Sequence, residues 1–237
     1  MLILGIETAT PWGTMALCDN DDIIFEVTIK IAKGGGEYLL ATLNQLLQKV
    51  GKDIKDIELI VVGTGPGSYT GVRVGMATAQ GLATSLNVPI KGINTLRIIA
   101  ENYRNSSKWI AVAIDARREE VYAALYESTA EGLIEVIVPA AMTVRQFAEQ
   151  CRAYDRVIIC GDAGKNYQQI WNEYPNFAIA PVYGGRPSAV LAIQIIYQNP
   201  HYQEGDRVLT PSYLRRVEAE VRLEERLNAG NRGANDH

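Results

Sequence analysis

The order of predicted strands and helices repeats once along the chain, and this repeat limits the possible folds more than any other feature. Residues 1–105 begin with the apolar run Leu2–Glu7, which ends in an acid, and continue with two more strand-like segments, a helix, a buried strand and a second helix. Residues 106–216 restart the same order with Trp109–Asp115, which also ends in an acid. Two βββαβα units in tandem predict a duplicated α/β fold with one lobe in each range. A charged segment, 217–237, follows, and its Gly/Asn-rich end is expected to be disordered.

Helices are expected where apolar residues recur every three or four positions. This spacing predicts helices over residues 37–50, 70–86, 144–151 and 187–197. Gly51, directly after the first of them, is typical of a helix C-cap.

The composition is that of a globular protein with little attraction for polyanions. The 237 residues include 23 Lys and Arg against 27 Asp and Glu, a net charge of −4, so the chain lacks the positive field that draws in nucleic acid. Its cysteines, Cys18, Cys151 and Cys160, lie far apart in apolar segments, which predicts reduced core thiols. The apolar N-terminus is too short for a membrane span and has no basic lead, so we expect a cytoplasmic protein without membrane contact.

The glycine-rich stretch Gly63–Gly75 matches neither of two phosphate-binding fingerprints. It contains no lysine, which a Walker loop requires for the β and γ phosphates. Counting from Gly63 or Gly65, the sixth position is Ser68 or Thr70, so the glycine spacing of a dinucleotide site is absent too. Two interpretations remain open: free backbone N–H groups that hold an anion, or a tight turn that lets a strand and a helix pack closely.

The helix expected after this stretch carries a line of small residues. Glycines and alanines recur every fourth position from Gly71 to Ala83, and the rest of its surface is largely apolar. One interpretation is that this helix and the Leu-rich helix before it pack only on their own sheet. The favoured prediction is a helical interface with a second protein. Its predicted residues are Leu39, Leu43, Leu46, Gly71, Gly75, Ala79 and Ala83.

The acids that end the first strand of each half are candidates for a nucleotide-binding remnant. In nucleotide-hydrolysing folds of this type, such acids orient Mg²⁺ through water. Glu7 and Asp115 are therefore predicted to form the remnant, together with Thr8 and Arg117 beside them. The alternative is that the two acids cap the neighbouring turns or pair with an arginine.

Histidine is too scarce for an independent catalytic site. The chain has only His201, in a Pro-flanked loop, and His237, at its end. Two histidines so placed cannot form the facing pair of a three-ligand metal site, and they disfavour a Ser-His-Asp or Cys-His nucleophile for the same reason. We therefore expect no metal and no tightly bound cofactor.

Five stretches of the sequence carry a more specific pattern. They are ILGIETAT near the start, GTGPGSYTGVRVGMATAQGLA over 63–83, GINTLRIIA over 92–100, AIDARREEVYAALY over 113–126 and PSYLRR over 211–216. Together they resemble the bacterial TsaB family, also called YeaZ. The resemblance implies an ASKHA fold, the duplicated architecture of actin, Hsp70 and sugar kinases, which agrees with the repeat. The chain departs from the family at Glu7, where Asp is frequent, and at Gly35, which stands where the family has a histidine.

The resemblance also implies a role in tRNA modification. TsaB proteins do not carry out the transfer themselves. They pair with the catalytic paralogue TsaD and, with the ATPase TsaE, support transfer of threonylcarbamoyl to the adenosine beside the anticodon. For this chain the resemblance implies a heterodimer with a TsaD-type partner, contact with tRNA only through the complex, and ATP and Mg²⁺ at the level of the complex.

Three points stay open on the sequence alone. The first is whether the isolated chain is a monomer or a homodimer. A competing function is a stand-alone ASKHA-type ATPase or glycoprotease-like enzyme, which needs a complete phosphate and metal site. A homodimeric scaffold unrelated to tRNA would use the same helices but would leave the family-specific stretches unexplained.

Overall fold

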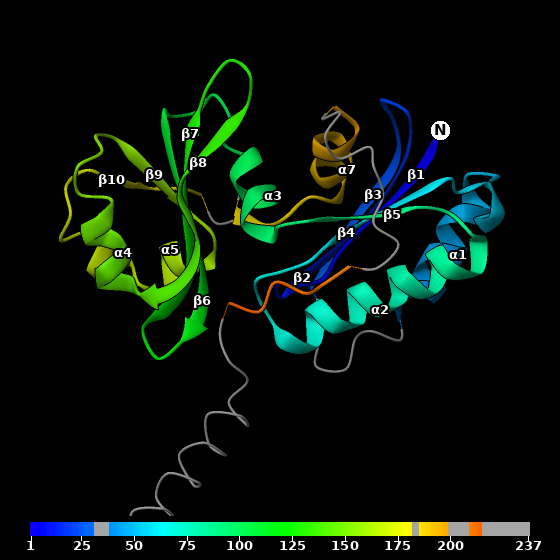
Figure 1. Ribbon diagram of the computed structural model, residues 1–237, viewed down its shortest axis with the longest axis horizontal. Helices are drawn as coiled ribbons and strands as arrows, with labels where there is room; N and C mark the ends of the chain where they lie inside the picture. Colours follow the sequence, from blue (N-terminus) through cyan, green and yellow to red (C-terminus); the bar gives the residue numbers. More distant parts are fainter. Residues whose placement is uncertain (31–37, 182–184, 199–208, 215–237) are drawn as a thin grey trace, which may run out of the picture.

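Two five-stranded sheets form the framework of the protein (Figure 1). The computed structural model describes residues 1–30, 38–181, 185–198 and 209–214. The strands of the first sheet are β1 (Leu2–Glu7), β2 (Trp12–Asp19), β3 (Asp22–Lys30), β4 (Leu59–Gly63) and β5 (Ile90–Ile93). The strands of the second sheet are β6 (Trp109–Arg117), β7 (Glu120–Ser128), β8 (Leu133–Thr143), β9 (Val157–Cys160) and β10 (Phe177–Ile179).

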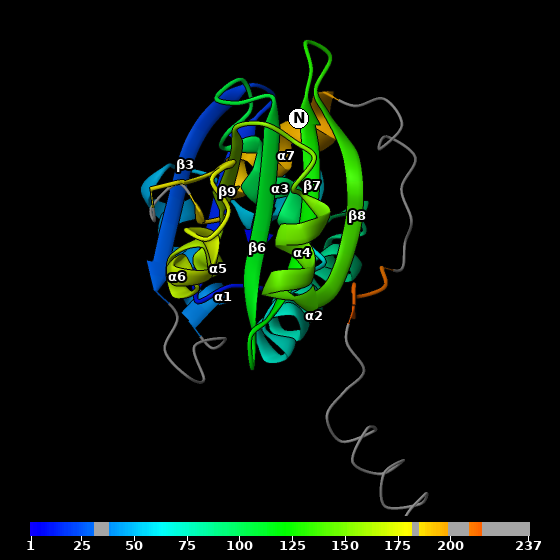
Figure 2. The same cartoon turned by 90° about the vertical axis from the view of Figure 1, so that its left-hand side faces the viewer.

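The strand order of one sheet repeats in the other, which confirms the predicted duplication. The order is β3-β2-β1-β4-β5 in the first sheet and β10-β9-β6-β7-β8 in the second, which is the same arrangement read from the opposite edge. In each sheet an antiparallel meander of three strands comes first, and two further strands run parallel to its first strand. Figure 2 shows β6, β7 and β8 of the second meander side by side.

Helices cover both faces of each sheet. They are α1 (Tyr38–Lys49), α2 (Tyr69–Leu86), α3 (Thr95–Glu101), α4 (Val144–Gln150), α5 (Asp162–Asn166), α6 (Gln168–Trp171) and α7 (Ala189–Gln198), with a 3₁₀ turn at Ile54–Asp56. Helices α1 and α2 lie on one face of the first sheet and α7 on the other. Helices α4, α5 and α6 lie on one face of the second sheet and α3 on the other. The predicted βββαβα order is present in both halves, with α5 and α6 in place of a single helix in the second half, and each half ends with one more strand and one more helix.

Helices α3 and α7 are exchanged between the halves. Helix α3 follows the first sheet in the chain, but its Leu96 and Ile99 pack into the core against β6 and β7 of the second sheet. Helix α7 ends the second half, but its Ile193 packs against β1 and β2 of the first sheet. Helix α7, which falls within the expected second lobe, 106–216, therefore packs on the first sheet.

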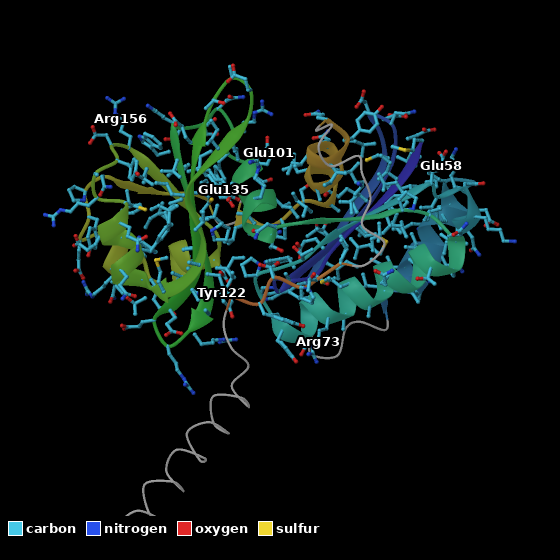
Figure 3. All side chains as sticks on the ribbon, viewed as in Figure 1. Glu58, Arg73, Glu101, Tyr122, Glu135 and Arg156 are labelled. Atoms are coloured by element: carbon cyan, nitrogen blue, oxygen red, sulfur yellow. The ribbon has the colours of Figure 1, made fainter. Side chains whose placement is uncertain are left out.

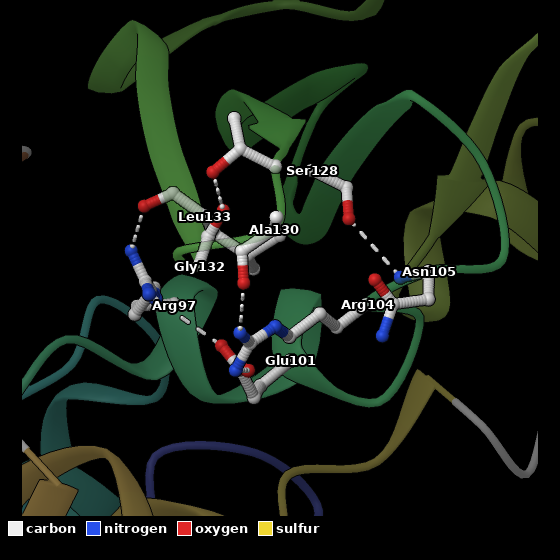
Figure 4. Close-up of polar contacts among 9 residues, drawn as sticks. Arg97, Glu101, Arg104, Asn105, Ser128, Ala130, Gly132 and Leu133 are labelled. Carbon is white, nitrogen blue, oxygen red and sulfur yellow. Dashed lines mark hydrogen bonds and ion pairs between the residues drawn. The ribbon is translucent and has the colours of Figure 1, made fainter.

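A charged cluster ties α3 to the β7–β8 hairpin (Figure 4). Arg97 Nη1 donates to the Leu133 carbonyl at 2.6 Å, and Arg104 Nη2 donates to the Ala130 carbonyl at 3.2 Å. The Glu101 side chain, only 10% exposed, lies between the two arginines, with Oε2 3.5 Å from Arg97 Nη2 and Oε1 3.3 Å from Arg104 Nη1. We call Arg97, Glu101 and Arg104 the α3 cluster. The two halves are therefore joined by polar bonds as well as by a shared apolar core.

Several predictions fall on residues that the structure does not describe. These are the placements of His201 and His237, the consequence of Gly35, and the expected disorder of 217–237. The cysteines are free and buried, which confirms the predicted core thiols. Among the helices of the described ranges, none is both long and apolar enough to cross a membrane.

Candidate functional site

Glu7, at the carboxyl end of β1, is fully buried and bonded through both carboxylate oxygens. Oε1 accepts a hydrogen bond from the Ala9 N–H at 2.5 Å, and Oε2 accepts one from the Thr95 hydroxyl at 2.6 Å. A Cβ on Gly63, at the end of β4, would overlap Oε2, so only glycine leaves room for this carboxyl group. Burial raises the pKa of Glu7 above its usual value, whereas the two hydrogen bonds act to lower it. Glu7 is therefore an internal tie between β1, β4 and the start of α3.

Thr8, the next residue, determines how closely α2 approaches the first sheet. Its Oγ1 donates to the Gly71 carbonyl at 2.7 Å. A Cβ on Gly71 would overlap the Thr8 carbonyl oxygen, and a Cβ on Gly75 would overlap Thr8 Oγ1. The glycines at the start of α2 are therefore needed for contact with the chain's own β1, as the tight-turn interpretation of this stretch requires.

The line of small residues on α2 faces the first sheet, so four of the seven predicted interface residues belong to the chain's own core. Of its residues, Leu43, Gly75, Ala79 and Ala83 are buried, and Leu39, Leu46 and Gly71 are half-buried. The buried alanines lie in one core with the apolar residues of β1 and β4. Small side chains let α2 sit close to the sheet, and the close approach to Thr8 is the physical reason for the line.

A second line of residues lies on the exposed side of α2. Arg73, Ala77, Gly81 and Ser85 recur every fourth position, and all are exposed. A Cβ on Gly81 would meet no atom within 4 Å. The small side chains of Ala77, Gly81 and Ser85 leave the backbone of this part of the face open to close approach by another helix, because interaxial distance depends on the side chains at the contact. We call these four residues the outer line of α2.

Asp115, the acid that occupies the corresponding place in the second half, is also committed to internal bonds. Oδ1 accepts from the Arg117 N–H and the Tyr167 hydroxyl, both at 2.8 Å. Oδ2 accepts from Asn166 Nδ2 at 3.0 Å, and the Asp115 N–H donates to Asp162 Oδ1 at 2.9 Å. Asp115 therefore caps the β6–β7 turn and ties it to α5, as the capping alternative predicts.

Two groups around Asp115 have shifted pKa values. Burial raises the pKa of Asp162, and the nearby negative charge of Asp115 adds to this effect. Burial and the hydrogen bond to Asp115 raise the pKa of Tyr167 to about 12. The Tyr167 hydroxyl therefore remains a hydrogen-bond donor at neutral pH.

The two acids have different hydrogen-bond partners. Glu7 accepts from Ala9 and Thr95, whereas Asp115 accepts from Arg117, Asn166 and Tyr167. In the same part of the chain, no group of three or more His, Cys, Asp or Glu could hold a metal ion. Arg117 contributes its backbone N–H, while its side chain is exposed. Glu7, Thr8 and Asp115 thus form hydrogen bonds within the fold through their side chains, and Arg117 forms one through its backbone N–H.

Sequence reasoning missed Thr95, Asp162 and Tyr167, which complete the two networks. A signal existed for Thr95, because the preceding Asn94 is a strong N-cap residue and its side chain accepts from the Leu96 N–H at 2.9 Å. Asp162 and Tyr167 reach Asp115 across 47 and 52 residues, so local sequence patterns carry no trace of the contact.

Comparison with known proteins places these features in a family. The sequence model described as TsaD, tRNA N6-adenosine threonylcarbamoyltransferase, matches residues 31–222. The tRNA threonylcarbamoyladenosine biosynthesis protein TsaB of Bacillus subtilis is 31% identical over 229 residues, which cover 94% of this chain and 97% of the relative. The protein of the same name from Escherichia coli is 36% identical over 135 residues, which cover 56% of this chain and 58% of the relative.

Solved structures agree with the sequence relatives. YeaZ from Pseudomonas aeruginosa matches with a TM-score of 0.76 at 24% identity, covering 90% of this chain and 99% of that one. Another structure from Pseudomonas aeruginosa, of an uncharacterized protein with similarity to peptidase YEAZ, gives a TM-score of 0.75 at 25% identity with the same coverage. These matches confirm the resemblance and the duplicated α/β fold. The chain belongs to the TsaB (YeaZ) family of tRNA threonylcarbamoyladenosine biosynthesis proteins.

Proposed function

We propose that the chain is a non-catalytic subunit that supports threonylcarbamoyl transfer to the adenosine beside the anticodon of tRNA. Its proposed partners are a TsaD-type transferase and a TsaE-type ATPase. Support for the pathway comes from the Bacillus subtilis relative, whose name refers to this modification and which aligns with 94% of the chain. Support for the partner comes from the match of the transferase's own sequence model to residues 31–222, which makes the proposed partner a paralogue.

The non-catalytic role is supported by one observation above all. The strand-end acids Glu7 and Asp115 both form hydrogen bonds within the chain through both carboxylate oxygens. Mg²⁺ held through water needs carboxylate oxygens that water can reach. Glu7 is fully buried, and both of its oxygens accept hydrogen bonds from the chain itself. Asp115 is half-buried, and both of its oxygens also accept hydrogen bonds from the chain. We therefore assign no tightly bound cofactor to this chain, and ATP and Mg²⁺ to the complex.

The partner surface is proposed to lie on the outer line of α2 and the adjoining face of α1. The outer line offers a backbone that a second helix can approach closely, and Leu40 of α1 leaves 50% of its surface exposed. The net charge of −4 gives the chain little means of neutralising phosphates. Contact with tRNA is therefore proposed to occur through the complex.

Gly81→Leu tests the partner surface because it adds a branched side chain at an open position. The variant is expected to melt at or above the wild-type temperature, because Leu favours a helix more than Gly does, but to lose heterodimer formation with the TsaD-type protein in size-exclusion chromatography. Gln169→Leu, which adds the same side chain to an exposed position of α6, is the matched control and is expected to assemble normally. Full assembly by Gly81→Leu would remove the interface from α2, and failure of the wild-type chain to assemble would contradict the partner role itself.

The competing stand-alone ATPase or glycoprotease-like enzyme draws no support from the described geometry. Its test is turnover by the isolated chain. ATP hydrolysis that is lost in both Glu7→Gln and Asp115→Asn would favour it over the subunit role.

A further inference from the structure

An arginine at the start of the outer line of α2 is held in place by two tyrosines. Arg73 Nε donates to the Tyr213 hydroxyl at 2.9 Å. The guanidinium carbon lies 3.9 Å from the centroid of the Tyr69 ring, a cation–π contact. The two tyrosine ring centroids are 5.4 Å apart, and the guanidinium carbon lies 5.9 Å from the Tyr213 centroid, so both rings contact the guanidinium. Figure 3 shows Arg73 on the side of α2 turned away from the first sheet.

The second tyrosine comes from the described segment 209–214, which is anchored on the first sheet. Leu209 packs against the core under α1 and α2. The Ser212 N–H donates to the Thr64 carbonyl at 2.8 Å. Because these contacts fix the segment beside the start of α2, Tyr213 is positioned by the fold. We call Tyr69, Arg73 and Tyr213 the arginine clamp.

The Arg73 guanidinium keeps N–H donors that can bind a partner. Its planar fork matches the two oxygens of a carboxylate, and fixing the fork in advance reduces the entropy lost on binding. Within the part of the chain that the structure describes, Arg73 forms no ion pair with an Asp or Glu, and Nε alone donates a hydrogen bond. Tyr69 and Tyr213 remain 39% and 43% exposed. Tyrosine and arginine are among the residue types enriched at the energetic centres of protein interfaces.

We propose that the arginine clamp binds a carboxylate of the TsaD-type partner and thereby selects this partner over a second copy of the chain. The inference rests on the proposed function, from which it takes the α2 interface. Helices α1 and α2, as described, contain no Asp or Glu, so these helices of a second copy would offer the guanidinium no carboxylate. A paralogue with an acid on its facing helix completes a bidentate pair. The heterodimer gains this ion pair and the homodimer does not, and this difference in binding free energy gives specificity.

The test compares partner affinity, by isothermal titration calorimetry, with self-association, by analytical ultracentrifugation. Arg73→Ala is expected to weaken heterodimer affinity about 10- to 100-fold, and Arg73→Glu more strongly. Arg73→Lys keeps the charge but loses the fork, so its loss is expected to be smaller. Arg156→Glu makes the same charge change on an exposed residue of the second half, far from α2 in Figure 3, and is expected to bind like the wild-type chain. Self-association is expected to be unchanged in every variant.

Four outcomes would overturn the inference. If Arg73→Glu keeps its affinity while Gly81→Leu abolishes the complex, the carboxylate site falls and the proposed function stands. If neither Arg73→Glu nor Gly81→Leu affects affinity, both the α2 interface and the carboxylate site at the clamp are wrong. If Arg73→Ala weakens self-association as much as heterodimer formation, the clamp does not select. If Arg73→Glu loses only tRNA binding in a filter assay, the clamp recognises phosphate instead of a protein.

Discussion

The Thr95 hydroxyl donates to Glu7 Oε2 at 2.6 Å and joins residues 88 positions apart. Glu7 ends β1, and Thr95 begins α3, the helix that carries the first half of the chain into the core of the second. The bond therefore lies where the two halves are fixed to each other. An acid at this place serves the assembly of the fold.

Glu7→Ala is expected to lower the free energy of unfolding by about 3–5 kcal/mol. The substitution leaves the Thr95 hydroxyl and the Ala9 N–H without their acceptor and opens a cavity at a fully buried position. Urea unfolding followed by circular dichroism measures the loss. Glu135→Ala, at an exposed site on β8, is the control, and an equal effect in the two variants would contradict the role of Glu7 as an internal tie.

The stability of the chain is expected to depend on pH through Glu7. Because burial raises the folded-state pKa above the usual value of 4.5, the protonated form is favoured in the folded state. The stabilisation of the folded state that comes from this pKa shift is fully present below pH 4.5. It is lost as pH rises through the folded-state pKa of Glu7. Glu7→Gln stays neutral and can keep both hydrogen bonds, with Oε1 accepting from Ala9 and Nε2 donating to Thr95. The wild-type chain is therefore expected to lose unfolding free energy relative to Glu7→Gln as pH rises from 4.5 towards neutrality. A difference between the two chains that is constant over this pH series would show that Glu7 does not titrate differently on folding.

Glycines on the two sides of α2 are expected to respond oppositely to the same substitution. Gly75→Ala places a methyl group against Thr8 Oγ1, and such overpacking costs about 1–3 kcal/mol. Gly81→Ala meets open space and improves helix propensity, so it is expected to raise stability by up to about 1 kcal/mol. Thermal melts of the two variants provide the measurement. A lower melting temperature for Gly81→Ala than for Gly75→Ala would reverse the assignment of the inner and outer faces.

The α3 cluster is expected to keep the two halves in one cooperative unit. Glu101→Gln removes the negative charge between Arg97 and Arg104, and we expect a loss of about 1–3 kcal/mol, below the range for a fully buried pair. Scanning calorimetry is expected to show one transition for the wild-type chain, because α3 and α7 each pack on the other half's sheet. Two separate transitions in the wild-type chain would contradict this coupling.

The duplication could be predicted from the sequence because strand and helix periodicities are local. The elements β5, β10 and α3, which have 4, 3 and 7 residues, were not predicted, because a short strand or helix gives a weaker periodic signal than a long one. The exchange of α3 and α7 depends on tertiary packing, since the sequence of an apolar helix face does not specify which sheet the helix covers.

The candidate site was predictable only in part. Glu7 and Asp115 stood out because each ends a buried strand, but their bonding partners lie up to 88 residues away. The small residues of α2 were assigned to the wrong side because a line of glycine and alanine permits close approach by a sheet as well as by a helix. The overlap of a Gly75 side chain with Thr8 decides between them, and it is visible only in three dimensions.

The central claim is that this chain supports tRNA modification as a subunit without its own catalytic site. The most direct test is the yield of threonylcarbamoyladenosine in a reaction reconstituted from the TsaD-type protein, the TsaE-type protein, tRNA and this chain, with the chain present, omitted or replaced by Asp115→Asn. Omission is expected to abolish the product, whereas Asp115→Asn, once shown to be folded and assembled, is expected to restore it. Undiminished modification without the chain, or a folded and assembled Asp115→Asn that gives no product, would contradict the claim.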